Sequence, residues 1–223
     1  FTNPTVSMFQ DRLAALEGGE ACIATSSGMA AILTMAMSHL QAGDHVVCSR
    51  SVFGATIQLF SNILGRFGIT TTYVDLSDTK AWQDAVQENT KLFYLETPSN
   101  PGLELVDMEM IGELVKKHNL IYFVDNCFAT PMLQTPSDYG ANLIVHSATK
   151  FFDGQGRVLG GIIVGTKPLI EKVRFFCRQT GPSLAPFNAW VLTKGLETLG
   201  LRLDRHCENA LKLAKALETI KGV

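Results

Sequence analysis

Apolar runs and amphipathic segments alternate along most of the chain. Three runs are apolar almost throughout, as in strands buried on both faces of a parallel sheet, and they cover residues 91–95, 120–124 and 143–145. Shorter strand-like runs cover 45–48, 70–74 and 160–164. Helical spacing covers 29–40, 55–67, 79–88, 107–118, 168–178 and 186–221, the last broken by glycines at 195 and 200. The alternation predicts an α/β domain with a mostly parallel central sheet sandwiched by helices.

The ends of the chain add two expectations. Ser7 and Gln10 have the spacing of a capping box, so a helix is expected to begin there and to end at Gly18-Gly19. The chain opens on Phe1 rather than methionine and closes on Gly222-Val223, shortly after a helical pattern. We therefore expect it to be part of a longer polypeptide.

Composition removes several classes of function. The 19 Lys and Arg nearly cancel the 21 Asp and Glu, and no basic stripe interleaves with aromatics, so we expect no nucleic-acid partner. No apolar run approaches the length of a membrane span and no signal peptide is present, so we expect no membrane partner. The five cysteines have no CxxC spacing, which favours free thiols in a reducing cytoplasm.

Ligands of open α/β sheets bind beyond the carboxyl ends of the strands, and polar residues gather at such positions here. Ser26-Ser27-Gly28-Met29 directly precedes a helix, where free backbone N–H groups favour an anion; an ordinary helix cap is the alternative. Asp125 ends an apolar strand and needs a partner, either a protonated ring nitrogen or a structural salt bridge or cap.

Two further positions carry groups suited to chemistry. Lys150 follows an apolar strand, where partial burial would favour the neutral, nucleophilic amine; a solvated lysine is the alternative. The hydroxyls of Ser147 and Thr149 are suited to phosphate oxygens. Asn100 lies between two prolines, in a turn that would direct it into the cleft or be merely structural. A phosphate cradle, an acid for a pyridine nitrogen and a lysine for an aldehyde together are what pyridoxal phosphate requires.

The chain also resembles a known family over essentially its whole length, the Cys/Met-metabolism enzymes that depend on pyridoxal phosphate. The resemblance rests on Ser26-Ser27-Gly28-Met29-Ala30-Ala31, Glu96-Thr97-Pro98-Ser99-Asn100-Pro101, Val124-Asp125-Asn126, Ser147-Ala148-Thr149-Lys150 followed by Gly154, and Pro186-Phe187 with Gly195-Leu196-Glu197-Thr198-Leu199. It implies the type I fold of pyridoxal-phosphate transferases. Residues 1–205 would then form the cofactor-binding large domain, and 206–223 would begin the connection to a further domain.

The resemblance also implies roles for individual residues. Lys150 would bind the cofactor covalently and carry protons between substrate carbons, and Asp125 would pair with the pyridinium nitrogen. The phosphate, the phenolic oxygen and the ring of the cofactor would be held by the remaining residues: Ser27, Gly28, Met29, Ser147 and Thr149 for the phosphate, Asn100 for the oxygen and Phe53 for the ring. No metal is implied.

Two departures from the family pattern affect these expectations. Phe53 stands where many relatives have a tyrosine stacked on the cofactor, so stacking is retained but a phenol proton donor is lost. The family's Tyr-x-Arg segment would lie before Phe1, and the arginine for the substrate carboxylate would lie beyond Val223. With the stretch 151–161, Phe53 is most similar to the branch of O-succinylhomoserine sulfhydrylases.

That branch implies replacement at Cγ: O-succinylhomoserine and sulfide would give homocysteine and succinate, in methionine biosynthesis. A cystathionine γ-synthase or a methionine or cystathionine lyase of the same family is the alternative, and a non-catalytic α/β binding domain a more remote one. The family implies a cytoplasmic homodimer or homotetramer with shared active sites. The sequence leaves open whether the ester is succinyl or acetyl and whether sulfide or cysteine is the donor.

Overall fold

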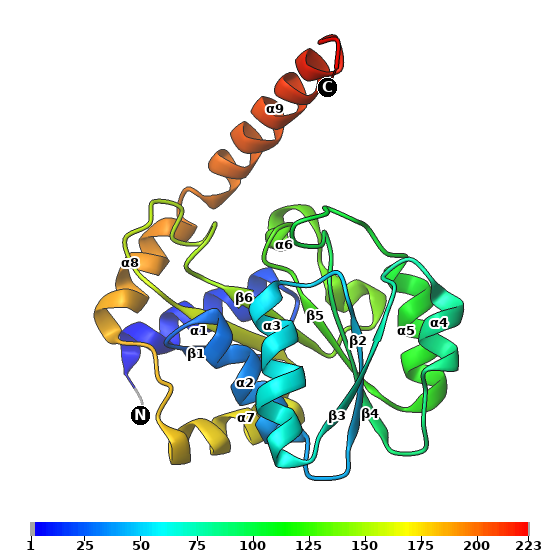
Figure 1. Ribbon diagram of the computed structural model, residues 1–223. Helices are drawn as coiled ribbons and strands as arrows, with labels where there is room; N and C mark the ends of the chain where they lie inside the picture. The colour runs from blue at the N-terminus through cyan, green and yellow to red at the C-terminus, as the bar shows by residue number, and fades with distance from the viewer. Residues whose placement is uncertain (1–2, 223) are drawn as a thin grey trace.

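The computed structural model describes residues 3–222, so Phe1, Thr2 and Val223 at the chain ends lie outside it (Figure 1). Seven strands in that range form one sheet in the order β1-β7-β6-β5-β4-β2-β3. The strands are β1 Ala21–Thr25, β2 His45–Ser49, β3 Thr70–Val74, β4 Thr90–Glu96, β5 Ile121–Asp125, β6 Leu143–Ser147 and β7 Gly161–Gly165. Neighbouring strands from β6 to β3 pair in parallel, and β7 runs antiparallel to both β6 and β1. The expectation of a mostly parallel sheet is confirmed.

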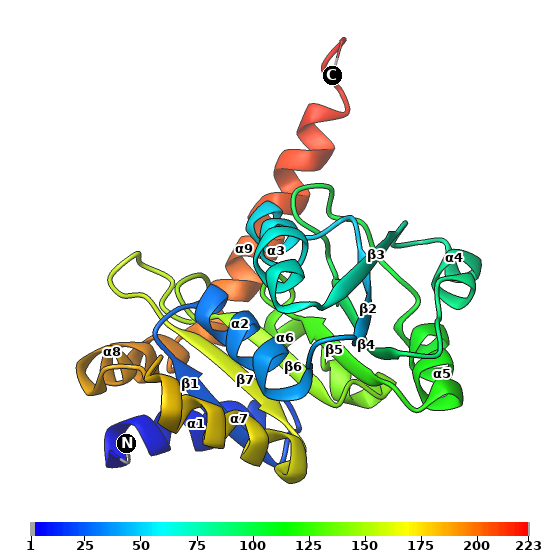
Figure 2. The same ribbon diagram turned by 60° about the horizontal axis from the view of Figure 1, so that its bottom comes forward.

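Helices cover both faces of the sheet (Figure 2). They are α1 Pro4–Leu16, α2 Gly28–His39, α3 Gly54–Gln58, α4 Thr79–Asp84, α5 Met108–His118, α6 Thr130–Leu133, α7 Lys167–Thr180, α8 Pro186–Leu196 and α9 Leu199–Leu217. One buried cluster joins one face of the sheet to α1, α4, α5 and α8, and a second joins the other face to α2, α7 and the helical turns after α3. The sheet is therefore buried on both sides, as its apolar strands require.

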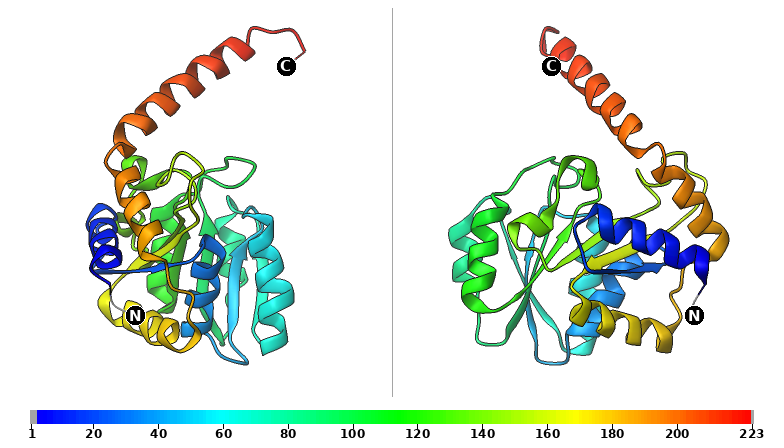
Figure 3. Two further views of the ribbon diagram at one scale, coloured as in Figure 1. Left: turned by 90° about the vertical axis from the view of Figure 1, so that its left-hand side faces the viewer. Right: turned by 180° about the vertical axis from the view of Figure 1, so that it is seen from behind.

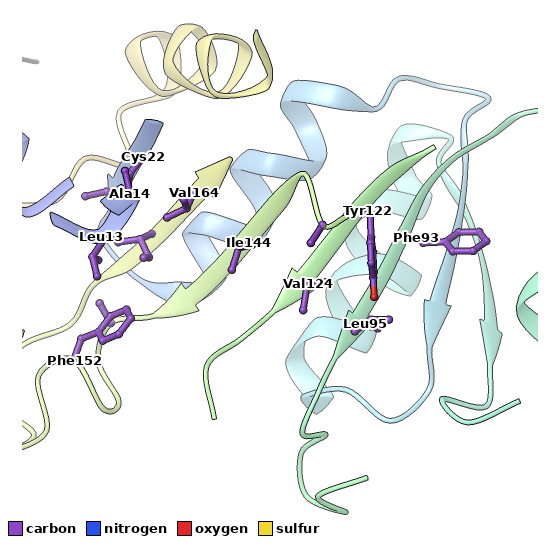
Figure 4. Close-up of a cluster of buried hydrophobic side chains, with 14 of the residues drawn as sticks. Leu13, Ala14, Cys22, Phe93, Leu95, Tyr122, Val124, Ile144, Phe152 and Val164 are labelled. Atoms are coloured by element: carbon purple, nitrogen blue, oxygen red, sulfur yellow. The ribbon is translucent and has the colours of Figure 1, made fainter. Parts of the chain in front are cut away.

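Alternate side chains along the strands supply the two clusters. Phe93, Leu95, Tyr122 and Val124 extend from one face of the sheet (Figure 4). They belong to the cluster that includes α1 and α5, and their strand neighbours belong to the opposite one. Full burial of each large apolar side chain contributes about 1.5–3 kcal/mol. The core therefore fixes the register of β4 and β5, and with it the position of the polar residue that ends each strand.

Several predicted boundaries were wrong. The first helix begins at Pro4, because Asn3 accepts a hydrogen bond from Thr5 N–H and proline is favoured in the first turn. Residues 55–67 are helical but irregular. The α-helix changes to a π-helical turn at Leu59–Ile63 and then to a 3-10 turn at Leu64–Phe67. The helix expected over 79–88 ends at Asp84. Gly200 lies inside α9 and does not interrupt it. The break between α8 and α9 falls at Glu197 and Thr198.

The helix α9 extends away from the rest of the structure (Figure 3). Leu203 is its last buried residue, and every residue from Asp204 to Gly222 is exposed. Leu211 and Leu213 are more than half exposed on it, as is Ile220 in the turn that follows. No helix within residues 3–222 is long and apolar enough to cross a lipid bilayer.

Candidate active site

A cavity of about 580 Å³ lies at the carboxyl ends of the parallel strands. All nine residues singled out in the sequence line it, namely Ser27, Gly28, Met29, Phe53, Asn100, Asp125, Ser147, Thr149 and Lys150. They come from the start of α2, the start of α3 and the ends of β4, β5 and β6 together with the loops that follow. The fold therefore brings together residues that are widely separated in the sequence.

The amino terminus of α2 forms one end of the cavity. Ser27 caps the helix, since its Oγ accepts a hydrogen bond from Ala30 N–H at 3.1 Å. Gly28 packs so closely against β6 that a Cβ at this position would lie 2.8 Å from the Cβ of Ser147. Only glycine fits there, and its absence of a side chain brings the helix terminus beside the Ser147 hydroxyl. The positive end of the helix dipole and this hydroxyl favour an anion such as a phosphate.

Lys150 and Thr149 lie on the turn that follows β6. Lys150 N–H donates to Ser147 O at 3.1 Å, which closes the turn. The Thr149 hydroxyl is already engaged, because Gly160 N–H donates to its Oγ1 at 3.2 Å and Gly160 O lies 3.3 Å away. The expectation that Lys150 is partly buried was wrong: the turn carries it beyond the strand end, and its side chain is exposed on the cavity wall.

Asp125 is buried at the end of β5, with 8% of its surface exposed. Its Oδ1 accepts a hydrogen bond from Cys127 N–H at 3.0 Å, and its Oδ2 accepts one from the Tyr94 hydroxyl at 3.3 Å. Burial raises the pKa of Asp125, while His146 and these two donors act in the opposite direction. Neutral donors leave the charge of a carboxylate uncompensated, so a cationic partner in the cavity would stabilise the ionised form.

Glu96 was quoted in a sequence motif but was not predicted to belong to the site. It ends β4, pairs in register with Asp125 and is only 3% exposed, so two buried carboxyl groups face the same cavity. Glu96 Oε2 accepts a hydrogen bond from Phe53 N–H at 2.7 Å. Burial, reinforced by the charge of Asp125, raises the pKa of Glu96 to about 8. The sequence did hold a signal, since Glu96 ends an apolar strand just as Asp125 does.

Phe53 and Asn100 line the opening of the cavity. Phe53 is the residue before α3, and its ring is 48% exposed while its backbone is held by Glu96. Asn100 is half-buried in the turn between two prolines and faces the cavity, as its position predicted. His206, in the exposed helix α9, also reaches the cavity and packs edge-on against Phe151 at 5.5 Å between ring centroids. No sequence pattern indicated His206.

The arrangement fits pyridoxal phosphate. It offers an anion site at the start of α2, a buried acid for a protonated ring nitrogen, an exposed amine and an aromatic ring at the opening. The volume lies within the range of about 300–1,000 Å³ that is usual for small-molecule sites. Two features would not be needed at a sheet edge that binds no ligand. They are the close contact of Gly28 with Ser147 and the pairing of the Glu96 and Asp125 carboxyl groups.

Comparisons with known proteins agree with this fit. The chain is 51% identical to O-succinylhomoserine sulfhydrylase of Pseudomonas aeruginosa, over 100% of this chain and 55% of that protein. It is 41% identical to L-methionine gamma-lyase of Treponema denticola, over 97% of this chain and 55% of that protein. A crystal structure of cystathionine gamma-lyase from Lactobacillus plantarum with L-serine superposes with a TM-score of 0.97 at 39% identity, covering 99% of this chain and 58% of that one.

The chain thus spans about half the length of the relatives it matches. The family model described as "Cys/Met metabolism PLP-dependent enzyme" matches residues 1–223. With this match, and with relatives well above 30% identity over nearly all of its length, the chain belongs to the pyridoxal-phosphate-dependent enzymes of Cys/Met metabolism.

Proposed function

We propose that the protein containing this chain catalyses a γ-replacement, converting O-succinylhomoserine and sulfide to homocysteine and succinate. The observation that carries the proposal is the cavity in which Lys150 and Asp125 meet the anion site of α2. The 51% identity to the sulfhydrylase of Pseudomonas aeruginosa supports this substrate pair over others in the family.

The residues at the strand ends hold the cofactor. The N–H groups of Gly28 and Met29, with the hydroxyls of Ser27 and Ser147, bind its phosphate. Thr149 secures the turn through its hydrogen bonds with Gly160 and lies on the cavity wall.

The ring of the cofactor is held by a different set of side chains. Among the residues that line the cavity, Asp125 would keep a proton on the ring nitrogen, Phe53 would hold the ring and Asn100 would bind the phenolic oxygen. The bound cofactor supplies an electron sink for negative charge that develops on the substrate. Asp125 maintains this capacity because a protonated ring accepts electrons more readily than a neutral one.

Lys150 has two tasks in this proposal. Its Nζ would hold the cofactor and, with substrate bound, would remove the proton from Cα. A further proton leaves Cβ as succinate departs from Cγ, and sulfide then adds at Cγ while protons return to the neighbouring carbons. One tethered amine can serve both carbons because they are adjacent and the amine stays beside them.

A γ-elimination is the second candidate, since L-methionine gamma-lyase of Treponema denticola is 41% identical to the chain. Such a lyase would release 2-oxobutyrate without an added nucleophile. Phe53 disfavours this reading, because a phenylalanine cannot donate a proton to a departing sulfur as a tyrosine could. A non-catalytic binding domain is disfavoured by the joint presence of Lys150 and Asp125 in one cavity.

The proposal is tested by supplying the full-length protein with O-succinylhomoserine and comparing products with sulfide, with cysteine and with no nucleophile. Homocysteine that forms only with sulfide is the expected result, and repeating the assay with O-acetylhomoserine gives the acyl preference. Cystathionine from cysteine, or 2-oxobutyrate without a nucleophile, would assign the protein to another branch of the family.

The proposal extends to domains and assembly. Residues 1–205 would form the cofactor-binding domain, and 206–223 would begin the connection to a further domain. Residues 206–217 lie on α9, and residues 206–222 are exposed. Phe53 and Leu159 line the cavity and are still 48% and 59% exposed, which favours a second copy that covers the opening in a cytoplasmic homodimer or homotetramer. Light scattering on the full-length protein measures the assembly, and a monomer that is fully active would contradict it.

A further inference from the structure

A buried polar cluster lies on the face of the sheet opposite the cavity. Glu17, at the end of α1, and His146, in β6, are 0% and 1% exposed, and His146 Nε2 contacts Glu17 Oε1 in a hydrogen bond. Asn126, which follows β5 and is 0% exposed, donates from Nδ2 to the same Glu17 oxygen at 3.0 Å. These three residues, the reverse-face cluster, have no part in the chemistry described above.

The reverse-face cluster extends to the end of β4. Asn126 and Gln134 exchange two hydrogen bonds of 2.9 Å, from Asn126 Nδ2 to Gln134 O and from Gln134 Nε2 to Asn126 Oδ1. Gln134 Nε2 also donates to Thr97 O at 2.8 Å. One set of bonds therefore connects the ends of β4, β5 and β6 to helix α1.

At the end of each of these three strands, the residue that takes part in these hydrogen bonds is the sequence neighbour of a residue that lines the cavity. Thr97 follows Glu96, Asn126 follows Asp125 and His146 precedes Ser147.

Successive side chains of an extended strand point to opposite faces, so the cluster and the cavity share one backbone. A shift of the cluster would move the carboxyl groups and the Ser147 hydroxyl directly.

Stability alone does not account for the reverse-face cluster. Glu17 Oε2 is buried and has no hydrogen-bond partner among residues 3–222. A buried carboxylate that is only partly satisfied is costly, and apolar replacements of buried ion pairs are often neutral or stabilising. The cluster is therefore a poor source of folding free energy, which favours a further role for it.

We propose that Glu17, His146 and Asn126 are positioning residues, which hold the strand ends from behind so that Asp125 and Ser147 keep the spacing that the cofactor requires. This rests on the proposed function, since it concerns the same site. The electrostatics agree: His146 lowers the pKa of Asp125 through the sheet, against the burial that raises it, whereas Tyr94 and Cys127 N–H act from the cavity side.

The test compares the same substitution at two buried histidines in the full-length protein. His146→Leu removes the contact with Glu17. His45→Leu is the matched control, because His45 is 1% exposed and bonded to Thr90 and Thr72 at the opposite end of the sheet. For each variant, Tm is measured, then the Kd for pyridoxal phosphate by absorbance titration at a temperature where the protein is folded, and the visible circular dichroism of the bound cofactor.

Both leucine variants are expected to lower Tm. His146→Leu should also weaken cofactor binding by about tenfold or more and alter the circular dichroism band, as removal of supporting residues does at metal sites. His45→Leu should leave Kd within about twofold, the scale of substitutions remote from a site. His146→Gln, which keeps an N–H donor for Glu17, should recover most of the affinity.

Equal Kd values and identical dichroism for the two leucine variants would overturn the proposal. If His146→Leu fails to fold, Glu17→Met replaces it, since methionine keeps the length of the side chain but removes the oxygen that both His146 and Asn126 contact; an unchanged Kd and dichroism in that variant would also overturn the inference. A wild-type protein that binds no pyridoxal phosphate would instead refute the proposed function.

Discussion

The two ends of the parallel strands bury polar groups in opposite ways. At the amino end, His45 is 1% exposed, and its two ring nitrogens contact the hydroxyls of Thr90 at 2.8 Å and Thr72 at 2.9 Å. At the carboxyl end, Glu96 and Asp125 are also nearly buried but lie side by side, and only neutral groups donate to them. The amino end buries a neutral hydrogen-bonded set, whereas the carboxyl end buries two carboxyl groups whose charge no cationic donor compensates.

This difference distinguishes polar groups that are buried to stabilise the fold from polar groups that are buried to bind a ligand. A satisfied buried group needs nothing further and contributes to a unique fold, whereas two adjacent buried carboxyl groups in a cavity are costly to ionise together and favour a cationic ligand. We therefore expect substitutions of the cavity residues Lys150 and Asp125 to change chemistry more than stability. Substitutions at the amino end should do the reverse.

Lys150→Ala should have the largest effect. It removes the amine that holds the cofactor and moves the substrate protons, so homocysteine formation should fall by about 10²–10⁴-fold or more. Because the side chain is exposed, the free energy of unfolding should change by no more than about 0.5 kcal/mol. The rate assay and urea unfolding measure the two quantities, and loss of the visible absorption band gives the chemical signature. Wild-type turnover in this variant would refute the site.

Asp125→Asn should come next. The amide keeps the size of the carboxyl group but cannot hold the ring nitrogen protonated, so we expect turnover to fall by about a hundredfold or more. Asp44→Asn is the control, because Asp44 is a 7% exposed carboxylate at the amino end that accepts Gln41 N–H at 2.8 Å. Turnover should be unchanged in the control. Equal losses in both variants would remove the distinction between the ends.

The sequence predicted the carboxyl end better than it predicted the rest of the fold. Lys150, Asp125 and Gly28 lie at strand ends or helix starts, and the topology of a parallel sheet brings such positions to one edge whatever the loops do. The apolar runs that became β4, β5 and β6 were correct to within two residues at each end. Local patterns were enough here because both faces of these strands are buried.

Features that depend on distant pairing were missed. The edge strand Ala21–Thr25 was not predicted, and its pairing partner, β7, lies far along the chain. Glu17 and His146 are 129 residues apart, and only the packing of α1 across the sheet makes them partners. His206 reaches the cavity because α9 packs beside Phe151. No local spacing encodes contacts of this kind.

Glu96→Gln should have a smaller effect, visible in the pH dependence of stability. Burial raises the pKa of Glu96 from 4.5 to about 8, so between these values the folded protein binds a proton that the unfolded chain releases. Stability from this group is full below pH 4.5 and is lost as pH rises through about 8.

Glutamine is neutral at every pH, so the free energy of unfolding of the variant should fall less than that of the wild type as pH rises. Urea unfolding of cofactor-free protein at several pH values between 5 and 9 is the measurement. A wild-type and a variant whose stabilities run parallel over that range would show that Glu96 titrates normally.

Thr90→Val should have the smallest effect on chemistry. It keeps the shape of the side chain but removes the hydroxyl that contacts His45 Nδ1 and accepts Gln87 N–H, each at 2.8 Å. Leaving buried polar groups without partners costs about 1–3 kcal/mol, so the free energy of unfolding should fall by that amount. Turnover and cofactor affinity should stay at wild-type values, because the cavity lies at the other end of the strands. If turnover fell together with stability, the two ends would be coupled through β4, and burial at the amino end could no longer be considered purely structural.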